Sequence, residues 1–186
     1  MAEMVEIGEG DYFVLHPRPV YLIVSLSEDS TPNVMAASWV TPVNDEPFLV
    51  GIALGKESKT LSNILRTGEC TINVVGEELV DKVYAAGSYS GWKTKKWEML
   101  GFTPHPSTKI KTPGIAEAYG FIECSLVKTV DFDTVEFVVC KSVSVHVKKD
   151  LVERNSWNLQ KAKILMHLKG RAFTTPRGVL FATRRA

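Results

Sequence analysis

The strongest constraint on the fold is the alternation of side chains in the second half of the chain. Two long segments, Tyr119–Val130 and Thr134–Val147, are separated by only three residues. In the second segment apolar side chains recur at every other position, a period typical of a half-buried antiparallel strand. The pair is therefore predicted to form a long β-hairpin. Asp131 and Asp133 flank its turn and are interpreted as turn formers rather than paired catalytic carboxylates.

The remaining segments add short strands and few helices. Apolar and β-branched runs predict strands over 20–27, Val34–Thr41, 48–54 and 70–75, and Pro42 is expected to break the chain after the second of these. Helices are expected over 59–66, with Gly68 as C-cap, over 77–86, and in a short piece before Gly101. Strand and helix alternate only once, so a doubly wound α/β fold is excluded. The pattern predicts a mainly β, antiparallel barrel with short peripheral helices.

Three further stretches are less regular. Residues 103–118 are expected to form an irregular surface connection. Residues 155–168 are ambiguous between a short helix and a structured turn, and 170–186 contain short strand-like pieces. Gly51, inside the strand over 48–54, indicates a bulge or the close approach of another group.

Size and charge limit the class of protein. The chain has 186 residues, 45% hydrophobic and 23% charged, which favours one domain over 1–186 with an ordinary core. A formal net charge of +1 gives no basic field of the kind that nucleic-acid binding needs. The N-terminus lacks a secretory signal and no apolar run is long enough to cross a membrane. We therefore expect a cytoplasmic protein whose Cys70, Cys124 and Cys140 are reduced core thiols.

Asn33–Val75 carries the candidate anion site. Ser58, Lys59 and Thr60 stand at the predicted start of a helix, where unpaired backbone N–H groups and a partial positive charge favour phosphate. The competing interpretation is that Ser58 or Thr60 only caps the helix. The sequence is not a P-loop, because the glycine required before Lys-Ser/Thr is missing.

Small side chains precede that helix in the predicted strand. Ala36, Ala37 and Ser38, followed by Trp39, would let a flat ring lie close to the backbone. An ordinary barrel strand that packs against a bulky neighbour explains them equally well. Lys93, Lys95 and Lys96 are interleaved with Trp92 and Trp97. They indicate either a solvated helix face or a segment that reaches over an anionic cofactor.

Histidines are the remaining candidates for acid–base chemistry. His167 and His146 could titrate near neutral pH, whereas His16 and His105 stand beside prolines in loops. No histidine has a partner at metal-ligand spacing, and no HxH, HExxH or CxxC motif occurs. A metal site is therefore not expected.

Taken together, these blocks resemble the flavin-reductase-like family of FMN-binding split β-barrels, which includes flavoredoxins and related ferric reductases. The resemblance starts at HPRPVYLIVS, runs through NVMAASWVTPVNDEPFLVGIAL and SKTLSNILRTGECTINVV, and continues in SGWKTKKWEMLGFTP, with a weaker similarity at ILMHLKGRAF. It implies a homodimer with FMN near the subunit interface. Similar proteins often carry an Asp where Lys95 stands and a histidine near Glu136.

The resemblance also implies site residues. The flavin ring would run along Met35, Ala36, Ala37, Ser38 and Trp39. The phosphate would be held by Ser58, Lys59 and Thr60, with Asn63 one turn further on. The loop from Ser90 to Lys96, including Trp92, would close over the flavin. Apart from what the resemblance implies, His167 is our candidate for a catalytic group near the nicotinamide.

Because FMN carries the redox chemistry, the protein needs no triad or metal cluster. The hypothesis is an oxidoreductase that transfers electrons from NAD(P)H through FMN to free flavin, ferric complexes or a small redox partner. The alternatives are an FMN-binding electron carrier without nicotinamide activity and a flavin-free split barrel. Pyridoxal-phosphate chemistry on a related barrel is less favoured, because its substrate-binding arginine pattern is absent.

Overall fold

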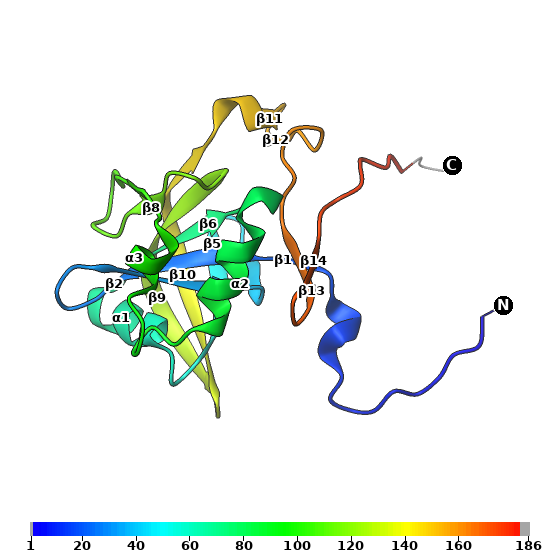
Figure 1. The fold of residues 1–186 in the computed structure, drawn as a ribbon, viewed down its shortest axis with the longest axis horizontal. Helices are drawn as coiled ribbons and strands as arrows, with labels where there is room; N and C mark the ends of the chain where they lie inside the picture. The colour runs from blue at the N-terminus through cyan, green and yellow to red at the C-terminus, as the bar shows by residue number, and fades with distance from the viewer. Residues whose placement is uncertain (1, 183–186) are drawn as a thin grey trace.

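The computed structural model describes residues 2–182, and Figure 1 shows its course. A seven-stranded antiparallel sheet contains the main strands predicted from the sequence, one of them divided into two strands. Its strands are β2 Tyr21–Leu26, β3 Pro32–Ala37, β4 Val40–Asn44, β5 Leu49–Gly55, β6 Glu69–Val74, β9 Gly120–Phe132 and β10 Val135–Val147. The helices are α1 Lys59–Thr67, α2 Val80–Ser88 and α3 Lys96–Leu100, with 3₁₀ turns η1 Tyr12–Leu15, η2 Glu77–Leu79 and η3 Lys149–Leu151.

The strand order explains how the sheet closes. It runs β3-β2-β6-β9-β10-β5-β4, so β3 and β4, consecutive in sequence, form its two opposite edges. The prediction of one strand over Val34–Thr41 was therefore wrong, because the chain bends at Ser38 and Trp39. Pro42 does not end the strand either: it lies inside β4, where an edge position tolerates its missing N–H group. The mainly β, antiparallel barrel is confirmed.

Arg18 fixes this bend. Its Nε donates to the Ser38 carbonyl oxygen at 3.0 Å, and its Nη2 donates to the Val40 carbonyl oxygen at 3.4 Å. On the other side, the Ala53 amide donates to the Trp39 carbonyl oxygen at 3.0 Å. These bonds satisfy backbone groups that the bend removes from the sheet ladder.

The core has two main parts. One fills the barrel and includes Ile23, Ile52, Leu54 and Ile72, and the other lies between the sheet and α2. Cys70, Cys124 and Cys140 are free and buried in the barrel, as predicted. A hydrogen bond with Cys70, followed by burial, raises the pKa of the Cys140 thiol, which keeps it protonated.

Local sequence signals account for several details. Ser58 caps α1 by accepting from the Leu61 amide at 3.2 Å, and Gly68 ends it in the left-handed conformation at φ +71°. Gly51 permits a close approach, because a Cβ there would lie 2.1 Å from Cζ of the Phe137 ring. The turn formers are also confirmed: the Asp133 amide donates to the Asp131 carboxylate at 2.9 Å.

A second, smaller sheet lies beside the barrel, with both described ends of the chain on that side (Figure 1). It contains β1 Arg18–Pro19, β13 Met166–Lys169 and β14 Ala172–Thr174. The ambiguous segment 155–168 contains no helix but β12 Ser156–Trp157, turns and the start of β13. The other short strands are β7 Pro104–His105, β8 Gly114–Ile115 and β11 Val152–Glu153. Of the predicted strand-like pieces over 170–186, β14 is observed, and residues 183–186 lie outside the described residues.

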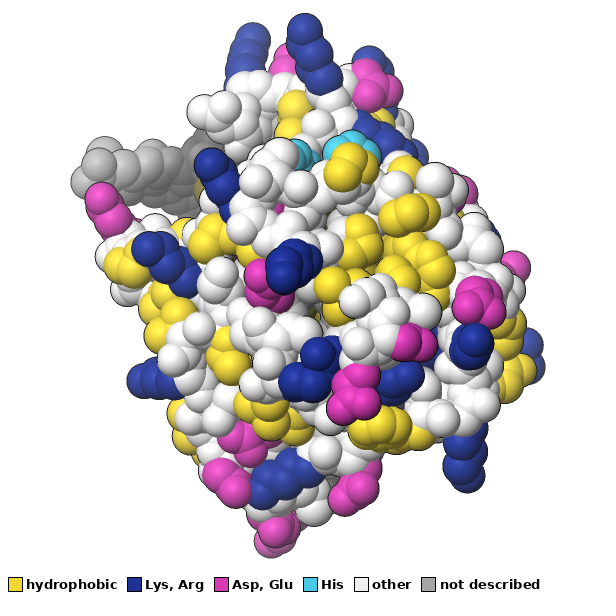
Figure 2. All heavy atoms as spheres, turned by 90° about the vertical axis from the view of Figure 1, so that its left-hand side faces the viewer, with side chains coloured by type: hydrophobic (Ala, Val, Ile, Leu, Met, Phe, Trp, Pro, Cys, Tyr) yellow, Lys and Arg dark blue, Asp and Glu magenta, His cyan; other side chains and the backbone are white. Residues whose placement is uncertain are grey.

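The surface is of mixed charge. On the face in Figure 2, basic and acidic side chains are interspersed, with hydrophobic patches between them. Within residues 2–182, every helix is too short or too polar to cross a membrane.

Candidate functional site

Two neighbouring cavities lie along β3. The His167 cavity, of about 260 Å³, is lined by Val20, Ala36, Ser38, Val83, Tyr84, Gly87, Ser88, His167, Gly170 and Phe173. The Lys96 cavity, of about 110 Å³, is lined by Asn33, Met35, Glu57, Ser58, Lys59, Thr60, Ala86, Gly87, Tyr89, Ser90, Gly91, Trp92 and Lys96. Gly87, near the end of α2, belongs to both. The two cavities therefore adjoin.

The alternation of β3 assigns its side chains to the two cavities. Asn33 and Met35 line the Lys96 cavity, whereas Ala36 and the following Ser38 line the His167 cavity. α2 packs closely there, since a Cβ on Gly87 would lie 3.4 Å from the Ala36 Cβ. The small side chains that the sequence showed at 36 and 38 thus leave open space beside the strand.

The Lys96 cavity contains a buried cation. Lys96 is 4% exposed, and its Nζ donates to the Ala86 carbonyl oxygen at 2.7 Å. Burial lowers the pKa of Lys96 to about 8. Within residues 2–182 none of the ion pairs includes this lysine. The interpretation of Lys96 as part of a solvated helix face was therefore wrong, and its ammonium group is available to an anion.

The loop before α3 is fixed against the start of α1. The Trp92 indole N–H donates to the Glu57 carbonyl oxygen at 2.9 Å, and the Lys59 Nζ lies 5.9 Å from the centre of the Trp92 ring. Gly91 is needed for this contact, because a Cβ there would lie 2.3 Å from the Asn33 Oδ1. The Lys96 cavity is thus enclosed by three segments distant in sequence.

Beneath the helix start lies a buried network of polar side chains. The Asn33 Nδ2 donates to the Thr60 hydroxyl at 2.9 Å, and the Asn63 Nδ2 donates to the Ser25 hydroxyl at 3.1 Å. All four residues are buried. Asn63 does not line the Lys96 cavity, and its place is in this supporting network. Thr60 belongs to both, since it lines the cavity while its hydroxyl accepts from Asn33.

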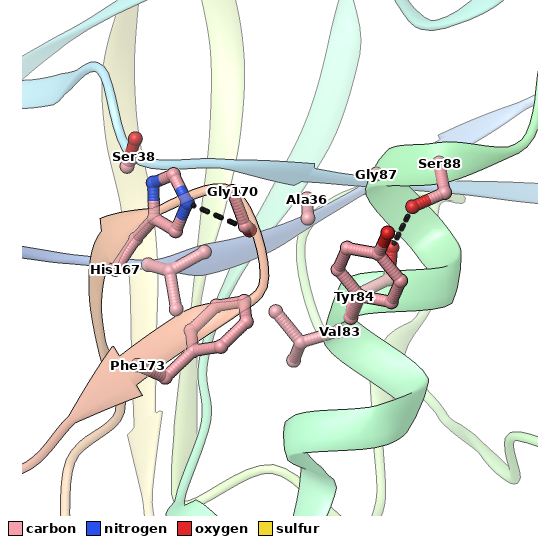
Figure 3. Close-up of a pocket in the computed structure, with 10 residues that line it drawn as sticks. Ala36, Ser38, Val83, Tyr84, Gly87, Ser88, His167, Gly170 and Phe173 are labelled. Atoms are coloured by element: carbon pink, nitrogen blue, oxygen red, sulfur yellow. Dashed lines mark hydrogen bonds between the residues drawn. The ribbon is translucent and has the colours of Figure 1, made fainter.

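The His167 cavity is framed by two elements, as Figure 3 shows: His167 and Phe173 come from the β13–β14 hairpin, and Val83 and Tyr84 from α2. The His167 Nε2 lies 3.3 Å from the Gly170 carbonyl oxygen. Because a carbonyl oxygen only accepts, Nε2 carries the hydrogen in this contact, and in the neutral ring Nδ1 is then the acceptor. The side chain presents one lone pair for a ligand donor.

The remaining residues predicted for the site are dispersed. Ala37 is buried in the barrel core, and Trp39 is 43% exposed on the far side of the bend from the His167 cavity. His146 lies in a different region, where its Nε2 is 2.6 Å from the fully buried Glu123 carboxylate. Within residues 2–182, no group of three or more His, Cys, Asp and Glu side chains is arranged to hold a metal.

Sequence reasoning missed several lining residues, including Asn33, Tyr84, Gly87 and Phe173. Gly91 and Gly87 could have indicated some of these residues from the sequence, because a glycine beside a candidate loop can mark a place where another segment packs closely against the backbone. Nothing local to Phe173 indicates its position, which depends on the pairing of β13 with β1.

Comparisons with known proteins agree with this architecture. Residues 13–176 match the family model described as "Flavin reductase like domain". The chain is 35% identical over 164 residues to an uncharacterized protein of Pyrococcus abyssi, covering 88% of this chain and 93% of that one.

Solved structures are also similar. Flavoredoxin from Methanosarcina acetivorans superposes with a TM-score of 0.87 at 25% identity, over 97% of this chain and 95% of that one. Nitrilotriacetate monooxygenase component B from Bacillus cereus superposes with a TM-score of 0.85 at 21% identity, over 98% and 100% of the two chains. The second likeness concerns the fold alone.

Proposed function

Because the chain belongs to the flavin reductase-like family, we propose that it is a cytoplasmic FMN-dependent oxidoreductase. It takes electrons from NAD(P)H and passes them to free flavin, a ferric complex or a small redox partner. The observation that carries this proposal is the adjoining pair of cavities along β3. One contains the buried Lys96 ammonium group, which forms no ion pair within residues 2–182, and the other is larger and lined mainly by small and apolar side chains. That combination fits a ligand with an anionic end and a flat ring.

The residues have distinct roles in this proposal. Lys96 and Lys59 neutralise the phosphate, and the start of α1 offers its backbone N–H groups. Asn33 and Asn63 position Thr60 and the helix start through the buried network. Met35 and the loop at Ser90 and Trp92 line the path between phosphate and ring.

In the His167 cavity, Ala36, Ser38 and Gly87 form the slot for the ring. When bound, FMN supplies the hydride and electron transfer chemistry. His167 accepts a hydrogen bond at Nδ1 in its neutral form and donates one when protonated, so it can orient a polar edge of ligand or cosubstrate.

The proposed assembly is a homodimer. Exposed apolar side chains occur at both ends of the long hairpin: Phe132, 62% exposed, stands beside its turn, and Val145, 56% exposed, near the other end of β10. Exposed apolar side chains often belong to contact surfaces between subunits. Light scattering of the purified protein should give twice the mass of one chain, and a monomeric mass would remove this part of the proposal.

An anaerobic spectrum tests the function. Purified protein loaded with FMN should lose the visible absorbance of oxidised flavin when NADH or NADPH is added, and should recover it on addition of ferric citrate or free flavin. A protein that never retains flavin contradicts the cofactor assignment.

The same experiment distinguishes a second candidate, an electron carrier, which the likeness to a flavoredoxin favours. A carrier binds FMN and is reduced by dithionite but not by either nicotinamide. That outcome would replace the NAD(P)H-dependent reductase with the carrier.

A further inference from the structure

A third cavity lies at the end of the long hairpin that is away from its turn. It has a volume of about 450 Å³, and its lining includes His105, Phe121, Val145, His146 and Lys148. We call it the His146 cavity. Its walls come from β7, β8, the first residues of β9 and the last residues of β10, and none of its residues lines the His167 or Lys96 cavity.

Two histidines from distant segments line this cavity. His105 belongs to β7 and His146 to β10, and their ring centroids are 6.2 Å apart. Imidazole nitrogens bind Zn²⁺ at about 2.0–2.1 Å, so two rings that share one ion have centroids about 5–6.5 Å apart. The observed separation lies within that range, which makes the pair compatible with one shared metal ion.

Each of these rings has one nitrogen engaged by an oxygen acceptor. The His105 Nδ1 lies 3.1 Å from the Pro106 carbonyl oxygen, and the His146 Nε2 lies 2.6 Å from a Glu123 carboxylate oxygen. A carbonyl oxygen and an ionised carboxylate oxygen only accept, so these two nitrogens carry the hydrogens of the neutral rings. The lone pairs of His105 Nε2 and His146 Nδ1 are left, and neutral imidazole binds metal ions through such a lone pair.

Glu123 places a negative charge behind His146. Its carboxylate is fully buried and accepts from the backbone amides of Thr108 and Lys109, each at 2.7 Å, which favours the ionised form. A carboxylate bonded to the outer nitrogen of a metal-binding histidine fixes the tautomer and makes the ring a stronger ligand. The Phe121 ring also stacks on His146, with 4.5 Å between centroids and 12° between planes. The His146 ring is therefore oriented by its surroundings.

The other two histidines form a contrasting pair. His16 and His167 have 5.4 Å between ring centroids, and each ring has one nitrogen close to a carbonyl oxygen. Within residues 2–182, however, His146 is the histidine that pairs with a carboxylate, and the cationic Arg18 lines the same cavity as His16. A cation is therefore favoured near His146 and not near His16.

We propose that the His146 cavity binds a divalent transition-metal ion through His105 Nε2 and His146 Nδ1, with water molecules as the remaining ligands. Zn²⁺, Ni²⁺ and Cu²⁺ suit imidazole ligands, whereas Mg²⁺ prefers oxygen ligands. The ion joins β7 to the end of β10 and so stabilises the folded chain. This metal site is separate from the proposed cofactor groove and does not depend on flavin.

Calorimetry tests the proposal with full-length protein purified without a histidine tag. Zn²⁺ should bind saturably, one ion per chain, at micromolar concentrations, and Mg²⁺ should not saturate at millimolar concentrations. Electron paramagnetic resonance of the protein with one equivalent of Cu²⁺ should show coupling to two imidazole nitrogens. Absence of saturation at millimolar Zn²⁺, or a Cu²⁺ spectrum without nitrogen coupling, overturns the proposal.

Two histidine substitutions locate the ion. His105 is exposed, so His105→Gln removes a ligand without removing core packing. It should weaken Zn²⁺ binding at least about tenfold and leave coupling to one nitrogen in the Cu²⁺ spectrum. His167→Gln is the control, with an expected change of less than about twofold. Loss of binding in His167→Gln and not in His105→Gln would place the ion between His16 and His167 and overturn the assignment.

A third substitution distinguishes a metal ion from an anionic occupant. Lys148 lines the cavity, and its Nζ donates to the Glu117 carbonyl oxygen at 3.0 Å. Removing this positive charge in Lys148→Gln should strengthen Zn²⁺ binding by about two- to fivefold at low salt. Weaker Zn²⁺ binding in this variant contradicts the proposal. Flavin retention and reduction by NAD(P)H, measured in the same preparations, report on the proposed function whatever the result with Zn²⁺.

Discussion

The two cavities along β3 differ in size and in the charge of their lining, although they share Gly87 and are lined by neighbouring residues of the same strand. The Lys96 cavity is the smaller of the two, and its lining includes the charged side chains of Glu57, Lys59 and Lys96, of which the buried Lys96 has its pKa lowered to about 8. The His167 cavity is wider and is formed mainly by small and apolar side chains. In the proposed complex, charge would therefore select the anionic end of the cofactor, and free space would select its ring. Riboflavin has the ring but no phosphate, so comparing its affinity with that of FMN separates the contribution of charge from that of free space.

The largest loss of flavin affinity is expected from a substitution that fills the His167 cavity. Ser38→Leu fills the slot without removing the hydrogen bonds of Arg18, because these go to the backbone oxygens of Ser38 and Val40 and not to the Ser38 side chain. Affinity for FMN and riboflavin should fall together by about 1,000-fold or more, because the ring loses its buried surface. Equilibrium dialysis measures both affinities, and Ser38→Ala, which keeps the space, is the control. Full flavin occupancy in Ser38→Leu would refute the assignment of this cavity to the ring.

Removing the buried charge should affect only one ligand. Lys96→Met is expected to weaken FMN binding by about 2–3 kcal/mol, or about 30- to 150-fold, through loss of a charge-assisted contact. Riboflavin affinity should stay within about twofold. Lys93→Met, at an exposed position of the same segment, is the control. Equal losses for both flavins would mean that Lys96 supports the fold and not the phosphate.

The affinities for FMN and riboflavin should also differ in their dependence on pH. In the free protein Lys96 loses its charge as pH rises through about 8, whereas a bound phosphate dianion would keep it protonated. FMN affinity should therefore decrease above pH 8, by at most about tenfold per pH unit, while riboflavin affinity should not follow. Fluorescence titrations between pH 7 and 9.5 test this, and a flat FMN profile contradicts it.

The stability of the free protein should change in the opposite direction. The pKa of Lys96 is lower in the folded protein than in the unfolded chain, so above pH 8 the unfolded state binds more protons. The contribution of Lys96 to the free energy of unfolding therefore increases with pH between about 8 and the unfolded pKa. Comparing urea denaturation of the unmodified protein and Lys96→Met over this range isolates that contribution, and an identical pH dependence in both would refute it.

The smallest loss of flavin affinity is expected from the contact between Arg171 and Tyr84, which lines the His167 cavity. The Arg171 guanidinium lies 5.4 Å from the centre of the Tyr84 ring, joining the β13–β14 hairpin to α2. Arg171→Gln removes a cation–π contact of about 0.5–1 kcal/mol and should weaken FMN and riboflavin alike by about two- to fivefold. The exposed Lys161→Gln serves as the control. A loss limited to FMN would show that Arg171 acts on the phosphate instead.

The comparison also shows which parts of the site were predictable. Ser58, Lys59 and the small residues at 36 and 38, which line the two cavities, could be named from the sequence because a helix start and a strand of small side chains are local patterns. Lys96 was named, yet one interpretation placed it in solvent, because its burial depends on packing of α3 and its loop against α2. Asn33 and Phe173 were missed since neither carries a local signal.

The sequence by itself determined most strands of the seven-stranded sheet, most of the helix boundaries and the mainly β class, since alternation, caps and turns are properties of neighbouring residues. Only the tertiary structure decided that Ser38 and Trp39 bend between the two edges of the sheet. Arg18 and Ala53, distant in sequence, supply the hydrogen bonds that this bend needs. The same closure places Ser38 in the His167 cavity and leaves Trp39 43% exposed on the other side of the bend. Contacts between remote segments thus determined where the small and aromatic side chains face.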